Sequence, residues 1–257
     1  MKDLEFSPDE MMVITAARLL EHHDNCFVGI GLPSQAANLA RLLYGQGLVL
    51  IYESGCIGAK PAYLPHSIAD AELAITSDFL VSVPEMFQYW LQGGRINIGF
   101  LGAAQIDKFA NINTTVIGDY NNPEIRLPGA GGAPEIAANC GEVVIMLQHR
   151  KRAFVDHLSF VTTTGHHKGG NSRKELGLKT AGPLHIVTDL GVLEPDSETR
   201  ELVPLSVHPG ATQEEMAANT GWVLSYNDRC ETTPTPTERE LTVLRSLRSS
   251  VPTERIS

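Results

Sequence analysis

The sequence predicts an α/β protein with an open, mostly parallel sheet flanked by helices. The first 52 residues alternate helix, strand, helix and strand, and strand–helix–strand is the unit from which parallel sheets are built. The strands are short apolar runs that end in glycine-rich or polar turns. With 257 residues, of which 42% are hydrophobic and 19% charged, the chain is long and apolar enough to bury a large core.

The elements of this opening unit follow from local signals. Ser7 is a cap residue before an apolar periodic run, which predicts a helix over 8–23. A strand is predicted at 26–30, a helix at 34–45 and a short buried strand at 48–52.

The later elements are shorter and less regular. Ser82 predicts the start of a short helix whose aromatic residues we interpret as core or a subunit interface, with stacking on a cofactor as the alternative. Pro134 fixes the start of another helix. We also predict a helix at 213–219, a hairpin turn between 188 and 196, and strands at 96–107, 143–147, 154–161, 186–187 and 203–205.

We predict one domain over residues 1–230 and a short appendage over 231–257. The appendage begins with a Pro/Thr linker at 231–236 and continues as a short amphipathic helix and a frayed tail. No internal repeat divides the longer part.

The balance of charge narrows the classes of partner. The chain has 30 acidic and 20 basic residues, a net charge of −10, which argues against nucleic acid as a partner. Two local basic runs are candidates for binding an anionic cofactor, although such runs are more often solvated surface. They are 149–152, and 166–168 with Arg173 and Lys174.

Residues 1–10 are polar and acidic, without the basic and apolar segments of an export signal. No apolar run approaches the ~18 residues of a membrane span, so we expect a cytoplasmic protein with no membrane partner. The cysteines are far apart and form no CxxC pair, so we expect reduced thiols and no metal site. They are Cys26, Cys56, Cys140 and Cys230.

The hexapeptide ESGCIG, at 53–58, is the main candidate for chemistry. It directly follows the predicted strand at 48–52, and ligands of open α/β sheets bind beyond the carboxyl ends of the strands. Glu53 and Cys56 place a carboxylate and a thiol there, and both groups can act as nucleophiles or transfer protons. Ser54 and Gly55 complete this candidate site. The alternative is an ordinary turn with an incidental cysteine.

Two glycine-rich turns are candidates for binding a developing oxyanion through backbone N–H groups. One contains Gly29 and Gly31 and leads into a helix. The other contains Gly129, Gly131 and Gly132 and precedes a second helix. A flexible turn is the alternative for the second, and neither matches a nucleotide-binding glycine pattern.

Several short motifs occur in one order along the chain. They are GIGLP at 29–33, YESG at 52–55, FLGAAQID at 100–107, NINTTVIGDY at 111–120 and GAGGA at 129–133, followed by shorter ones at 160–162, 187–191, 208–210 and 219–221. Together they resemble the β subunit of class I coenzyme A transferases, of the glutaconate CoA-transferase type, over nearly the whole chain. The resemblance implies the open α/β sheet of that family, an acyl-CoA substrate, and an α subunit that completes the active site in a heterodimer or α2β2 assembly.

The resemblance also implies roles for the hexapeptide. In such transferases a glutamate attacks the acyl-CoA thioester and becomes a glutamyl-CoA thioester, and Glu53 matches that residue. This attack requires a carboxylate shielded from water and a stabilised thioester oxygen.

Cys56 leads us to prefer a decarboxylase. Its position resembles that of a cysteine in the 3-methylglutaconyl-CoA decarboxylase that shares this fold. Loss of CO2 from 3-methylglutaconyl-CoA gives a dienolate delocalised onto the thioester oxygen, and protonation yields 3,3-dimethylacryloyl-CoA. Cys56 would move the proton and Glu53 would support it.

Two other functions stay open at this point. One is CoA transfer between dicarboxylic acids with Glu53 as the nucleophile, and the other is a non-catalytic CoA-binding subunit. A packing role is the alternative for Cys56. We expect no separate cofactor, because coenzyme A enters as the substrate thioester.

Overall fold

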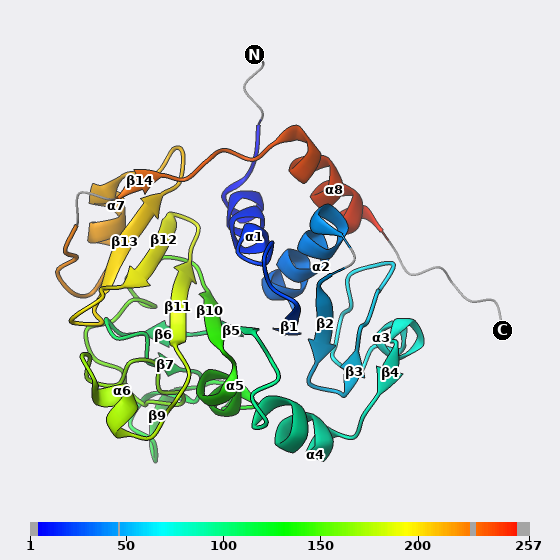
Figure 1. The fold of residues 1–257 in the computed structure, drawn as a ribbon. Coiled ribbons are helices and arrows are strands. Elements are labelled where there is room, and N and C mark those ends of the chain that lie inside the picture. The colour runs from blue at the N-terminus through cyan, green and yellow to red at the C-terminus, as the bar shows by residue number, and fades with distance from the viewer. Residues whose placement is uncertain (1–4, 46, 227–229, 251–257) are drawn as a thin grey trace.

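The computed structural model describes residues 5–45, 47–226 and 230–250 (Figure 1). Within these residues a ten-stranded sheet runs through the molecule. In spatial order its strands are β14 (Glu231–Thr232), β13 (Leu202–Val207), β12 (Gly191–Pro195), β11 (Gly182–Val187), β10 (Glu142–Met146), β5 (Ile98–Gly102), β1 (Asn25–Val28), β2 (Val49–Tyr52), β3 (Cys56–Ile57) and β4 (Phe79–Leu80).

The centre of the sheet is parallel and its two ends contain the antiparallel pairs. Strands β11, β10, β5, β1 and β2 pair in parallel, whereas β11–β12, β12–β13, β2–β3 and β3–β4 are antiparallel. This confirms the predicted open, mostly parallel α/β sheet. The carboxyl ends of the five central strands share one edge, and Gly29 and Glu53 directly follow two of these strands, β1 and β2.

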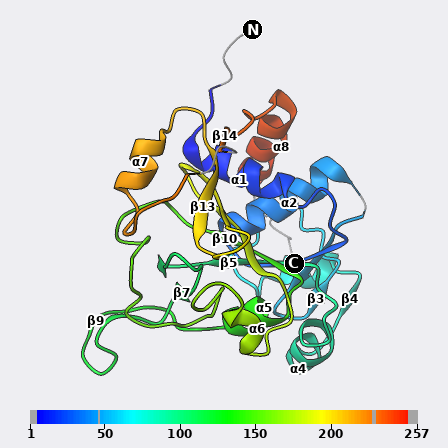
Figure 2. The same cartoon turned by 60° about the vertical axis from the view of Figure 1, so that its left-hand side comes forward.

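The two faces of the sheet carry different elements (Figures 1 and 2). One face packs on α1 (Pro8–Arg18), α2 (Leu32–Tyr44) and α8 (Glu238–Ser249). The other face packs on α5 (Ala133–Asn139), the π-helix η1 (Met86–Leu91) that continues α4 (Val83–Glu85), and the hairpin of β6 (Gln105–Ile106) and β7 (Ile112–Asn113). The remaining short elements are α3 (Ala71–Thr76), α6 (Ser172–Glu175), α7 (Gln213–Ala218) and the hairpin of β8 (Val116–Gly118) and β9 (Pro123–Arg126). Leu73 of α3 belongs to the first core cluster, and Met216 of α7 belongs to the second.

Alternation along the strands divides the core in two. In β2, Leu50 and Tyr52 belong to the cluster under α1 and α2, whereas Ile51 between them belongs to the cluster under α5 and η1. Neighbouring side chains of a strand point to opposite faces, so a continuous apolar run is what a sheet covered on both sides requires.

Several sequence-based elements differ from the structure. The predicted strand at 154–161 is wrong, because Phe154 forms only an isolated bridge with Ile106 and the residues after it leave the sheet. The first helix ends at Arg18, and residues 19–22 form turns that bring the chain toward β1. The predicted strand at 96–107 is broken into β5 and β6 at Ala103 and Ala104.

Helix α8 packs into the same core as the first two helices. Leu241 and Leu244 are fully buried against α1 and α2. Arg18 on α1 donates to both carboxylate oxygens of Glu240, at 2.7 and 2.8 Å. The division of the chain near residue 230 stays a prediction, and the predicted tail at 251–257 lies outside the described residues.

Candidate active site

Glu53 lies in a tight turn at the carboxyl end of β2. The N–H of Gly55 donates to the carbonyl oxygen of Tyr52 at 2.9 Å, so Glu53 and Ser54 occupy the two central positions of the turn. Gly55 has φ +98°, and a Cβ on it would lie 2.0 Å from the carbonyl oxygen of Val81. A side chain therefore cannot be accommodated here, and glycine fixes both the turn and the direction in which Glu53 leaves the sheet.

The side chain of Glu53 reaches the start of α5. A Cβ built on Gly132, the residue before α5, would lie 3.2 Å from Oε1 of Glu53 and 3.0 Å from Cζ of Phe87. Carboxylate, glycine and aromatic ring thus meet at one point, although they come from three distant segments. Glu53 and Gly132 are predicted from the sequence as site residues, whereas the aromatic helix that contains Phe87 is predicted as core or a subunit interface, with stacking on a cofactor as the alternative.

The Glu53 carboxylate is partly shielded from water and has no hydrogen bond or ion pair with the described residues. Its residue is half-buried, and no side chain or backbone group of the described residues forms a hydrogen bond or ion pair with it. A carboxylate without a protein partner keeps its lone pairs available for attack on an electrophilic carbon.

The predicted turn at Gly29 and Gly31 lies next to Glu53. Strands β1 and β2 pair up to Val28 and Tyr52, so Gly29 and Glu53 are the next residues on two neighbouring strands. Gly31 has φ +88° and precedes α2, whose first turn has no side-chain cap. The uncapped start of this 13-residue helix faces the same edge of the sheet as Glu53.

The second predicted turn supplies fewer donors than expected. The N–H of Gly129 is already bonded to the carbonyl oxygen of Thr114 at 2.8 Å, and the Thr114 hydroxyl donates back to the Gly129 carbonyl at 2.8 Å. In contrast, the N–H groups of Gly131 and Gly132 have no acceptor within the described part of the chain. Gly131 and Gly132 are therefore the available donors, and Gly129 has a structural role.

Cys56 lies in β3 with its side chain in the core. Only 4% of the residue is exposed, and it belongs to the cluster under α1 and α2, whereas its neighbour Ile57 faces the α5 side. The Ser54 hydroxyl lies 3.5 Å from the Cys56 sulfur. The structure therefore brings Glu53 to Gly132 and Phe87, but directs Cys56 to the opposite face of the sheet.

Comparison with known proteins identifies the family of the chain. The family model for coenzyme A transferase matches residues 10–219. The chain belongs to the coenzyme A transferase family. One of the subunits of the 3-oxoadipate CoA-transferase of Pseudomonas knackmussii is 57% identical over 242 residues, which cover 94% of this chain and 93% of that protein.

Solved structures show the same scaffold. Glutaconate coenzyme A-transferase from Acidaminococcus fermentans superposes on this CoA-transferase chain with a TM-score of 0.88 and 30% identity, covering 94% of each chain. The decarboxylase AibA/AibB superposes with a TM-score of 0.80 and 22% identity, covering 95% of each chain. The second similarity concerns the fold alone.

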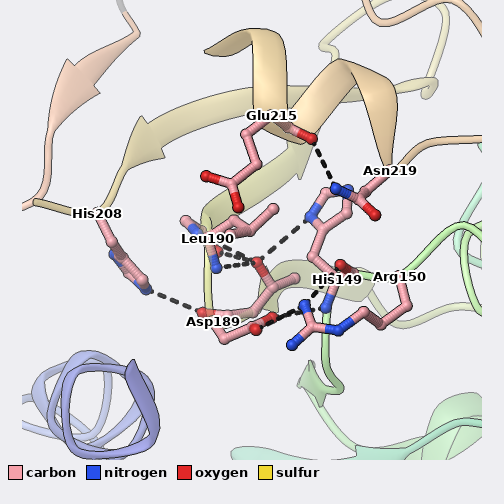
Figure 3. Close-up of polar contacts among 9 residues, drawn as sticks. His149, Arg150, Asp189, Leu190, His208, Glu215 and Asn219 are labelled. Carbon is pink, nitrogen blue, oxygen red and sulfur yellow. Dashed lines mark hydrogen bonds and ion pairs between the residues drawn. The ribbon is translucent and has the colours of Figure 1, made fainter. Parts of the chain in front are cut away.

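His149 and Arg150, the first two residues of one predicted basic run of this CoA-transferase chain, belong to a polar network around the buried Asp189 (Figure 3). His149 is fully buried and its ring stacks on Phe154, with 3.8 Å between ring centres. Its backbone N–H donates to Asp189 at 2.7 Å, and Arg150 forms an ion pair with Asp189 at 2.8 Å. The second run is also partly structural, since the buried Arg173 donates to backbone carbonyls.

Burial lowers the pKa of His149 to about 4. The Thr220 hydroxyl donates to a backbone carbonyl, so it accepts a hydrogen bond from Nε2 of His149 at 2.9 Å. Among the described residues, the hydrogen-bond partner of Nδ1 is the Thr188 hydroxyl, 3.4 Å away. This hydroxyl already accepts hydrogen bonds from two backbone N–H groups. A second proton on the ring would thus lack a good acceptor. Burial likewise lowers the pKa of His208 to about 4.

None of the helices that the structure describes is long and apolar enough to cross a membrane. Among the same residues, no three side chains of His, Cys, Asp or Glu converge on a point that could hold a metal ion.

Proposed function

We propose that this chain is the β subunit of a CoA-transferase that moves coenzyme A between dicarboxylic acids, with Glu53 as the nucleophile. The observation that carries the proposal is the Glu53 carboxylate, half-buried and without a protein partner among the described residues, against Gly132 at the carboxyl edge of the sheet. Membership of the coenzyme A transferase family supports the reaction class.

The chemistry of transfer follows from this arrangement. An oxygen of Glu53 attacks the thioester carbon, the carbon–sulfur bond breaks, and an acyl-glutamyl anhydride and CoA thiolate form. The thiolate then attacks the Glu53 carbonyl, which releases the first acid and leaves a glutamyl-CoA thioester. The second acid reverses these steps. The unbonded N–H groups of Gly131 and Gly132 are suited to stabilise the oxyanion at each addition.

The partner and the substrate are proposed from the relatives. The protein 57% identical to this chain is one subunit of a 3-oxoadipate CoA-transferase, and a solved relative is a glutaconate CoA-transferase. Both acids are dicarboxylic. We therefore propose an α subunit as the partner and a short dicarboxylic acid as the acyl group, with 3-oxoadipate as the first substrate to test.

Decarboxylation, the preferred hypothesis from the sequence, is less well supported. It depended on Cys56 acting together with Glu53, and the thiol of Cys56 packs into the core under α1 and α2. The similarity to the decarboxylase AibA/AibB, at 22% identity, concerns the fold alone.

The deciding experiment uses the co-purified complex of this chain with its α subunit. Given 3-oxoadipyl-CoA, the wild-type complex should form a new acyl-CoA only after a second acid is added, and borohydride added before that acid should trap Glu53 in reduced form. The Glu53→Gln variant should lose at least about a thousandfold in turnover, because the nucleophile is gone. The Cys56→Ala variant should keep most of it.

Release of CO2 without an acceptor acid would overturn the transferase proposal. The same complex should therefore also be given 3-methylglutaconyl-CoA alone, with the products followed by mass. If Cys56→Ala abolished release of CO2 from 3-methylglutaconyl-CoA in a complex that still assembles, the decarboxylase hypothesis would be restored.

A further inference from the structure

A second feature at the carboxyl edge of the sheet is a groove of about 600 Å³. Ala103 and Ala104, which follow β5, form one side, and Leu147 and Gln148, which follow β10, form another. The two alanines occupy little space, so the groove extends down to the ends of these strands. The carboxyl edge is where open α/β sheets bind their ligands.

The groove combines apolar walls with positive charge. Ile117 and Ile125, from the β8–β9 hairpin, contribute apolar surface, and Ile125 is 52% exposed. The exposed residues Arg150 and Arg152 also line the groove and give it positive charge. Such a lining suits a short carbon chain that ends in an anionic group.

The two arginines differ in their hydrogen bonds and ion pairs. Arg150 forms an ion pair with the buried Asp189 at 2.8 Å and donates to the carbonyl oxygen of His149, so its charge is compensated and its position fixed (Figure 3). Arg152 is exposed and has no hydrogen bond or ion pair with any residue that the structure describes. In a chain of net charge −10, Arg152 is an available cation at this site.

The groove and Glu53 are close enough to share one substrate. Strands β5 and β10, which lead into the groove, are two and three positions from β2 in the sheet, or about 10 and about 14 Å, which a short dicarboxylic chain and an arginine side chain together can span. One loop also joins the groove to the glycine turn beside Glu53. Thr114 binds Gly129 of the donor turn and lies two residues before β8, whose hairpin lines the groove.

We propose that this groove binds the distal carboxylate of the dicarboxylic acyl group, with Arg152 as its cationic partner and Arg150 as a neighbour held in place by Asp189. The inference rests on the proposed transferase function and adds the residue that distinguishes a dicarboxylic from a monocarboxylic acid.

The test compares Arg152→Gln with Lys151→Gln in the α/β complex, with propionyl-CoA as the donor because its acyl group has no second carboxylate. Both variants remove one positive charge from the same exposed turn, but Lys151 does not line the groove. With 3-oxoadipate as acceptor, Arg152→Gln should raise KM about tenfold, the loss expected for one hydrogen bond to a charged group, and Lys151→Gln should change it less than about twofold. With acetate as acceptor, both variants should match the wild type.

Three outcomes would overturn the proposal. The first is an unchanged KM for 3-oxoadipate in Arg152→Gln, and the second is an equal rise of this KM in Lys151→Gln. The third is an equal rise in Arg152→Gln of the KM for acetate or for the CoA thioester; a rise for the thioester would place a phosphate of CoA in the groove. Acceptor-dependent transfer by the wild-type complex is measured in the same assay, so failure of the groove and failure of the transferase function are distinguishable.

Discussion

Gly132 sets how closely the Glu53 carboxylate can approach the start of α5. A Cβ at this position would lie 3.0 Å from Phe87 and 3.2 Å from Glu53, so either the ring or the carboxylate would move by a few tenths of an ångström. The backbone of Gly132 has φ −83°, which any residue can adopt. Substitution here therefore tests side-chain geometry without straining the backbone.

We expect Gly132→Ala to lower kcat about tenfold and to change the free energy of unfolding by less than about 1 kcal/mol, because a small displacement of a reacting group is costly for catalysis and small for stability. The measurements are steady-state kinetics and urea unfolding. Gly47→Ala is the control, since a Cβ on Gly47 would meet nothing within 4 Å. Wild-type kcat in Gly132→Ala would show that the contact has no role in positioning Glu53.

At the scale of elements, α8 is attached by a buried apolar stripe and by two ion pairs. Leu244 is fully buried between α1 and α2. Arg18–Glu240 and Arg245–Glu10 join the helix to α1, and the hydrogen bonds of Arg245 lower the pKa of Glu10. Apolar burial contributes more than partly exposed ion pairs, so the leucines hold this helix in place.

Leu244→Ala should lower the free energy of unfolding by about 2–5 kcal/mol, through lost transfer energy and the cavity that it leaves. Thr242→Ala, on the exposed side of the same helix, should change it by less than about 0.5 kcal/mol. Urea denaturation followed by circular dichroism measures both. Equal stability of the two variants would mean that α8 is not packed as described.

An element is predicted well from the sequence when the interactions that form it lie within a few neighbouring residues. The helix start at Ser7 was correct because a capping box needs only residues 7–10. The hairpin of β3 and β4 was missed because strands of two residues have no period, and it exists through the contact of Gly55 with Val81. Glu53 is predicted from its local motif, whereas Phe87 comes from another segment and only the fold brings it to Glu53.

At the scale of the whole molecule, buried neutral histidines couple folding to pH. Burial lowers the pKa of His149 and His208 from 6.5 to about 4. In this range the unfolded chain binds more protons than the folded one. Stability contributed by the neutral rings is therefore complete above pH 6.5 and declines as the pH falls toward 4.

We expect the free energy of unfolding to fall between about pH 7.5 and about pH 5 by about 2 kcal/mol for each of these two histidines. His208→Gln should remove one such contribution from the difference between the two pH values, measured by urea unfolding. His157→Gln is the control, because the His157 side chain is 92% exposed and should leave the difference unchanged. A pH dependence that is the same in all three proteins would contradict this origin.

The nucleophile and the groove are carried by different segments, and this has a consequence for how the scaffold can diversify. Glu53 depends on the turn after β2, whereas Arg152, the cation of the groove, lies in the turn that follows β10. Substitutions of Arg152 that alter recognition of the second carboxylate need not disturb the reactive acid, and the reverse also holds. Reaction type and substrate choice can therefore evolve as separate modules, and solved proteins with this scaffold include both a transferase and a decarboxylase.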